Sequence, residues 1–127
     1  MIKTAINTHD APEAIGPYSQ GVRTQGINIT VSGQIPIDPQ TGEFVSDDIK
    51  DQTHQCLKNM RAILEKTGAG MAHVTDVTVM LTDINDFAAM NEVYEQYFEH
   101  PYPARAAFQV VALPKGAKVE IRCTAHL

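Results

Sequence analysis

The chain has 127 residues, of which 43% are hydrophobic and 20% are charged, and these ordinary values exclude a disordered or fibrous protein. Its net charge of -5, with lysine and arginine scattered singly, argues against a protein that binds nucleic acid. The N-terminus lacks the apolar core of a signal peptide, and no apolar run approaches the roughly 20 residues of a membrane span. We therefore expect a single cytoplasmic domain over residues 1–127, with no membrane partner.

The N-terminal part of the chain is predicted to form strands. Residues 4–7 fit a short strand, and residues 18–24 and 27–35 fit two further strands joined by a tight hairpin near Gly26. Residues 36–42, with the sequence PIDPQTG, cannot continue a central strand, because proline removes a backbone donor. This segment is therefore predicted to be a loop.

Two helices separated by a strand follow. Residues 47–66 carry apolar side chains at helical spacing, and Gly68 lies where a C-terminal cap is expected. Residues 74–82 are rich in β-branched side chains, which favours a strand. The second helix is predicted over residues 86–99, because the sequence HPYP at residues 100–103 ends it.

The last two strands are predicted over residues 105–113 and 118–127, joined by a turn at residues 114–116. Apolar and polar residues alternate strictly in the final strand, which indicates one buried face. The order of elements predicts an α+β fold with one mixed sheet of about six strands and two helices on one face. The other face must meet water or another copy of the chain, and closed cyclic oligomers are the usual way to cover such a face.

The cysteines and histidines give no sign of a disulfide framework or a metal site. Cys56 and Cys123 are far apart and match no redox or metal spacing, so we expect both to pack as small hydrophobic residues. The five histidines include no pair at metal-binding helical spacing. The chain also contains no glycine-rich phosphate loop and no nucleophile elbow.

Arg105 is the one charged residue in the stretch YPARAAFQV. A buried arginine needs an anion, because an unpaired charge away from water costs several kcal/mol or more. Its planar guanidinium fits a carboxylate through two parallel hydrogen bonds. The pattern alone favours the alternative that Arg105 is exposed or pairs with a carboxylate of the chain, such as Glu120 or Asp86.

Four further residues have both a structural and a functional interpretation. Glu120 is either a solvated strand residue or, if the final two strands pair, a group that moves protons in the same cleft as Arg105. Tyr18 either covers a pocket or packs with its hydroxyl in solvent, and Asn91 either faces water or serves a site. Gly33 indicates a β-bulge or a close approach to the backbone, of which a ligand is one possible cause.

Several blocks of the sequence, in order, resemble the RidA/YjgF family of reactive intermediate deaminases, also called the endoribonuclease L-PSP family. These blocks are APEAIGPYSQG, VSGQIPIDPQTGE, LTDINDFAAMNEVYEQYF, YPARAAF and LPKGAKVEI, and together they cover nearly the whole chain. The resemblance implies a chorismate-mutase-like homotrimer whose sheets face a central barrel, with ligand clefts between subunits. It also implies the hydrolysis of enamines and imines such as 2-aminoacrylate, 2-iminobutanoate and 2-iminopropanoate to 2-oxo acids and ammonia, without a cofactor.

The resemblance also implies roles for individual residues. Arg105 corresponds to the carboxylate-binding arginine of the family, and Glu120 to the acidic residue that positions a water molecule. Tyr18 matches the pocket tyrosine, Gly33 the glycine that contributes its backbone, and Asn91 the asparagine near the pocket.

The chain departs from the family pattern directly after the arginine. Ala106 and Ala107 stand where many members carry a small polar residue and a cysteine, and Val111 stands where smaller or basic residues are common. Ala107 can contribute to substrate binding through its backbone but not through a thiol. These changes keep a second interpretation open, a non-catalytic trimer that binds a 2-oxo acid. A third, ribonuclease, follows the older family name, but the acidic composition argues against it.

Overall fold

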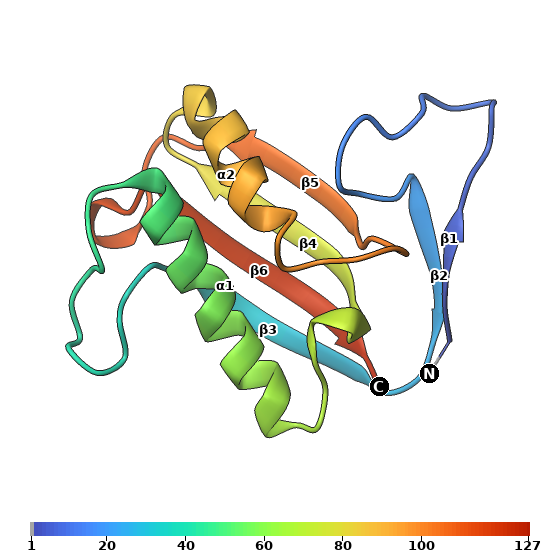
Figure 1. The fold of residues 1–127 in the computed structure, drawn as a ribbon, viewed down its shortest axis with the longest axis horizontal. Coiled ribbons are helices and arrows are strands. Elements are labelled where there is room, and N and C mark those ends of the chain that lie inside the picture. Colours follow the sequence, from blue (N-terminus) through green and yellow to red (C-terminus); the bar gives the residue numbers. More distant parts are fainter. Residues whose placement is uncertain (1) are drawn as a thin grey trace.

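The computed structural model describes residues 2–127, which form six strands and two helices in an α+β arrangement (Figure 1). The prediction of a single sheet is wrong, because the strands lie in two sheets. The four-stranded sheet is mixed, as expected, because β4 pairs in parallel with β5 and antiparallel with β6. The small antiparallel sheet contains β1 (Ile2–Ile6) and β2 (Gly21–Gln25), and the larger sheet contains, in spatial order, β3 (Asn28–Gln34), β6 (Val119–His126), β4 (Val74–Leu81) and β5 (Ala104–Gln109).

The predicted hairpin at Gly26 is also wrong, because the chain crosses there from the small sheet to the large one. Gly26 has a φ of 139°, and a Cβ atom at this position would lie 2.8 Å from the carbonyl oxygen of Leu127. Ile27 and Leu127 exchange backbone hydrogen bonds of 2.8 and 2.9 Å. The alternation of side chains located β3 correctly, but alternation does not specify which strand pairs with it.

The first helix follows the prediction closely, and the second is shorter. Helix α1 (Ile49–Lys66) begins where the Asp48 carboxylate accepts a hydrogen bond from the backbone of Asp51, and Gly68 follows its end with a φ of 87°. Helix α2 (Phe87–Tyr94) ends five residues earlier than predicted. The backbone N–H groups of Gln96 and Tyr97 donate to carbonyls three residues back, so the helix tightens into turns and ends.

The hydrophobic core lies between the large sheet and the two helices, which cover the same face of that sheet (Figure 1). Cys56 and Cys123 are buried in this core as free thiols, as the sequence predicted. Burial raises the pKa of both thiols, which keeps them protonated and unreactive at neutral pH. The fully buried side chains of the core include Leu57, Met60, Leu64, Val74, Val79, Leu81, Met90, Tyr94, Val119 and Ile121.

The opposite face of the large sheet carries the alternate residues of its strands. Met80 and Glu120 lie opposite each other on β4 and β6, and Phe108 on β5 lies opposite Met80 on the other side. The Phe108 side chain is 44% exposed. Within residues 2–127, no helix is both long and apolar enough to cross a membrane.

Candidate functional site

Arg105 projects from β5 toward the helices. It lies opposite Val77 of β4, which is buried in the core beneath the helices, and residues paired across neighbouring strands share a face. The guanidinium carbon Cζ lies 4.7 Å from the ring centroid of Tyr94 and 5.6 Å from those of Phe87 and Tyr18. The cation is therefore partly buried among three aromatic rings, whose faces attract positive charge.

The hydrogen-bond partner of Arg105 is neutral. Its Nη1 atom donates to Oδ1 of Asn91 over 2.6 Å. Both ion pairs found among residues 2–127 involve basic residues of α1, so the predicted alternative of a carboxylate partner such as Glu120 or Asp86 is wrong. Burial lowers the pKa of Arg105, yet an arginine stays charged at neutral pH. Among the described residues, the partly buried charge of Arg105 therefore has no anionic partner.

Tyr18 reaches Arg105 from a loop that is distant in sequence. The backbone N–H of Tyr18 donates to the carbonyl of Gly16 over 2.8 Å, which turns the chain tightly before the tyrosine. The next residue, Ser19, donates through its backbone N–H to the carbonyl of Pro103 over 3.1 Å, and its hydroxyl donates to the carbonyl of Tyr102. These bonds fasten the loop to the segment that precedes β5, so the Tyr18 ring is held beside the guanidinium.

The two alanines that follow Arg105 point in opposite directions. Ala107 lies opposite Val79 and packs against the core, on the same face of β5 as Arg105. Ala106 lies opposite Thr78 and is exposed on the other face. Of the two, Ala107 is therefore the residue whose side chain limits the space near the guanidinium.

Glu120 and Gly33 meet on the face of the sheet that is turned away from the helices. The register of β3 shifts between Val31 and Gln34, which confirms the predicted bulge around Gly33. A Cβ atom on Gly33 would lie 2.9 Å from the carboxyl carbon Cδ of Glu120, closer than real contacts allow. The glycine therefore leaves the space that the Glu120 carboxylate occupies.

The predicted site residues thus form two groups on opposite faces of the sheet. The Arg105 group contains Arg105, Tyr18, Asn91 and Ala107, and the Glu120 group contains Glu120 and Gly33. Arg105 lies opposite Val77 and Glu120 lies opposite Met80, and these two β4 positions differ by an odd number of residues. The final two strands, β5 and β6, do not pair, because β4 lies between them. Within one copy of the chain, Arg105 and Glu120 therefore do not face a common cleft.

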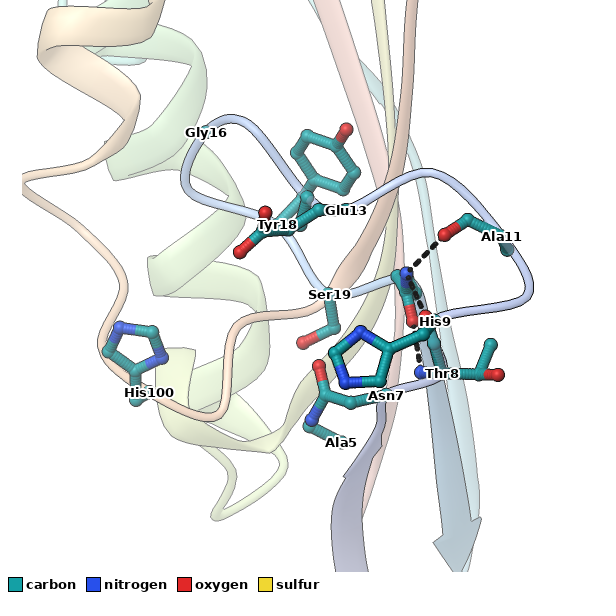
Figure 2. A pocket seen from close by; sticks show the side chains of 12 residues that line it. Ala5, Asn7, Thr8, His9, Ala11, Glu13, Gly16, Tyr18, Ser19 and His100 are labelled. Atoms are coloured by element: carbon teal, nitrogen blue, oxygen red, sulfur yellow. Dashed lines mark hydrogen bonds between the residues drawn. The ribbon is translucent and has the colours of Figure 1, made fainter.

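Tyr18 also lines a cavity of about 600 Å³ between the N-terminal loop and the segment around His100 (Figure 2). Figure 2 shows His9 and His100 on different walls of this cavity, and Gln20 fastens one wall through hydrogen bonds to Thr8 and Pro12. Arg105 and Glu120 do not line it. Of the residues that contact Arg105 in the described chain, Tyr18 is the one that lines this cavity.

Two residues that contact Arg105 were not predicted as site residues. Phe87 and Tyr94 belong to α2, and the guanidinium of Arg105 lies over both rings. With Asn91 they stand at positions i, i+4 and i+7 of α2, a spacing that places all three on one helix face. That spacing was visible in the sequence, but the strand against which this face packs was not.

The described residues do not form a cluster of metal ligands. Within residues 2–127, no group of three or more His, Cys, Asp or Glu side chains is arranged to hold a metal ion. The chemistry available to the Arg105 group is the recognition of an anion by a charged, planar donor. The chemistry available to Glu120 is the acceptance and donation of a proton.

The chain is similar in sequence to proteins of a known family. The family described as Endoribonuclease L-PSP matches residues 8–127. The RutC family protein y4sK of Sinorhizobium fredii is 52% identical over 122 residues, which are 96% of each chain. The 2-iminobutanoate/2-iminopropanoate deaminase of Homo sapiens is 49% identical over 125 residues, covering 98% of this chain and 90% of the human protein.

A solved structure supports the same assignment. The crystal structure of E. coli TdcF with bound serine has 46% sequence identity and a TM-score of 0.75, and the match covers 98% of both chains. The family match, the sequence relatives and the fold agree over almost the full length of the chain. The chain therefore belongs to the endoribonuclease L-PSP family, which is also the RidA/YjgF family.

Proposed function

We propose that the protein is an imine deaminase that hydrolyses 2-iminobutanoate and 2-iminopropanoate to 2-oxo acids and ammonia. The observation that carries this proposal is the partly buried charge of Arg105, which has aromatic neighbours and a neutral hydrogen-bond partner but no anion. A 2-imino acid supplies a carboxylate directly beside its reactive C=N carbon. The name of the human relative supports this choice of substrate.

Arg105 binds the substrate carboxylate in this proposal. One guanidinium nitrogen is already engaged by Asn91, and the remaining N–H groups are free for two parallel hydrogen bonds to the carboxylate. Such a clamp fixes the adjacent C2 atom of the substrate at a defined place. Positioning of this kind can supply a large part of the rate acceleration. The Tyr18 ring closes the site beside the clamp, and the backbone at Ala107 lies next to it.

The complete site requires a second copy of the chain. Because Glu120 and Gly33 lie on the opposite face of the sheet from Arg105, we propose that each cleft combines the Arg105 group of one subunit with the Glu120 group of its neighbour. A homotrimer with three such clefts satisfies this requirement, since a closed ring presents the same two surfaces at every contact. The uncovered sheet face, with its exposed Phe108, is the surface available for that contact.

The reaction then proceeds as an addition followed by an elimination. The imine nitrogen is protonated, and Glu120 takes a proton from water as the water oxygen forms its bond to C2. The resulting carbinolamine receives that proton on its nitrogen. The C–N bond breaks, ammonia leaves, and the hydroxyl group loses its proton to give the 2-oxo acid. An enamine such as 2-aminoacrylate enters after a proton adds to its C3 atom.

The direct test generates the imine in place with a threonine dehydratase and follows its disappearance together with ammonia release. We expect the purified protein to accelerate both well beyond the buffer rate. If neither is accelerated under conditions in which the human relative is active, the proposal is wrong.

Substitution of Gly33 by alanine tests the position of Glu120. The new methyl group collides with the Glu120 carboxylate and displaces it, so we expect kcat to fall about tenfold to 100-fold, as small misplacements of reacting groups do. Gly70→Ala is the matched control, because a Cβ atom there meets no neighbour and the backbone is extended. Equal kcat values for the Gly33→Ala and Gly70→Ala variants would show that the position of Glu120 does not matter.

A second candidate function is a non-catalytic trimer that binds 2-oxo acids. The observation that favours it is the completeness of the Arg105 group within one copy of the chain, whereas Glu120 lies on the other face. Calorimetric binding of 2-oxobutanoate without any acceleration of imine hydrolysis would support this candidate over the enzyme.

A further inference from the structure

One face of α2 forms the surface on which the Arg105 guanidinium rests. Phe87, Asn91 and Tyr94 lie on this face, and all three contact the guanidinium through a ring or a hydrogen bond. Within residues 2–127 the guanidinium makes one side-chain hydrogen bond, to Asn91, and a single bond does not by itself fix the plane of the group. The aromatic contacts are therefore needed to fix the plane of the guanidinium.

Tyr94 differs from the other two rings in being fully buried. Its side chain is 0% exposed and belongs to the hydrophobic core, whereas Tyr18 and Phe87 are only partly buried. Its ring packs on that of Phe98, with ring centroids 4.6 Å apart. Tyr94 also makes the closest of the three approaches to Arg105, at 4.7 Å. Tyr94 is therefore the most deeply buried of the three rings that surround the guanidinium.

The contact between Tyr94 and Arg105 is made by the ring and not by the hydroxyl. The hydroxyl oxygen is buried and has no hydrogen-bond partner within residues 2–127. Burial raises the pKa of Tyr94, so the hydroxyl stays protonated and offers no negative charge to the arginine. What remains is the electron-rich face of the ring beneath the cation, an attraction that strengthens as water is excluded.

We infer that Tyr94 is a positioning residue, whose ring holds the Arg105 guanidinium in the orientation that binds the substrate carboxylate. The inference rests on the proposed function and adds to it a residue that touches neither the substrate nor the reacting atoms. Loss of the ring leaves the charge of Arg105 in place but lets its plane turn. The affinity for the substrate carboxylate should therefore fall more than the rate of the chemical step.

The experiment measures calorimetric binding of 2-oxobutanoate together with KM and kcat for imine hydrolysis. For Tyr94→Leu we expect Kd and KM to rise roughly three- to thirtyfold, the range expected for a partly buried cation–π contact, with kcat changed less. Tyr94→Phe keeps the ring, so it should bind within about threefold of wild type. It should also melt at an equal or higher temperature, because it removes an unpartnered buried hydroxyl.

Phe98→Leu is the matched control, since Phe98 packs on Tyr94 in the same core but does not contact Arg105. It should lower the melting temperature about as much as Tyr94→Leu while leaving Kd unchanged. If Tyr94→Leu fails to fold, pentafluorophenylalanine at position 94 keeps the ring shape and removes its electron-rich face, and Kd should rise as for leucine.

The outcomes separate this inference from the proposed function. Wild-type affinity in the Tyr94→Leu or the fluorinated variant, with imine hydrolysis intact in the wild type, overturns the role of Tyr94 alone. An equal rise of Kd in Phe98→Leu also overturns it, because the effect would then come from the core in general. Weaker binding in Tyr94→Leu, without hydrolysis by the wild type, retains the inference and overturns the enzymatic function.

Discussion

Arg105→Lys is expected to lower kcat/KM for 2-iminobutanoate hydrolysis by about 100-fold or more, because a lysine cannot form the two parallel hydrogen bonds of a guanidinium. The substitution keeps the positive charge and removes the planar group that rests between Tyr94, Phe87 and Tyr18. The variant therefore loses both the paired hydrogen bonds to the carboxylate and the packing of the guanidinium against the three rings. The measurement is the rate of imine decay, with calorimetric binding of 2-oxobutanoate as a second readout.

The control for this prediction is Arg23→Lys, which makes the same chemical change at an exposed position of β2. We expect wild-type kinetics for that variant and little change in melting temperature for either one. If Arg105→Lys retains wild-type kcat/KM, the carboxylate clamp is not at Arg105.

Glu120→Gln is expected to lower kcat by about 100-fold to 10,000-fold, the usual contribution of a general acid or base. Glutamine has the size of glutamate, so it fits the space above Gly33 and leaves the fold unchanged. It cannot take a proton from water. Because Glu120 does not contact the carboxylate in our account, the Kd for 2-oxobutanoate should stay within a few-fold of wild type.

The combination of a large loss of kcat and a preserved Kd distinguishes Glu120 from Arg105. A parallel loss of 2-oxobutanoate affinity would mean that Glu120 supports the pocket instead of moving a proton. A wild-type kcat in the Glu120→Gln variant would show that Glu120 takes no part in catalysis.

The secondary structure was largely predictable because its signals are local. Helix α1 has an amphipathic pattern with a capping aspartate and a terminal glycine, and β6 alternates strictly between buried and less buried residues. Both elements occur within two residues of their predicted bounds. The end of α2 was predicted less well, because it depends on a tightening of the backbone after Tyr94.

The pairing of strands was not predictable from the same signals. Periodicity defines the faces of a strand but not its neighbours, so the insertion of β4 between β5 and β6 could not be derived from either strand. The placement of Arg105 and Glu120 on opposite faces follows from their registers with β4, which is non-local information. Arg105 and Glu120 could therefore be identified as candidates from the sequence, but the condition under which they would share a cleft within one chain, pairing of β5 with β6, is not met.

The activity of assemblies that contain both the Arg105→Lys and the Glu120→Gln variant shows whether each cleft is shared between two subunits. The two variants are given different tags, produced together, and purified through both tags in turn, so that only mixed assemblies remain. In a mixed cyclic trimer, one cleft joins an intact Arg105 group to an intact Glu120 group. We expect about a third of wild-type activity from two variants that are each nearly inactive. Mixed assemblies that stay at the level of the single variants would contradict a site shared between subunits.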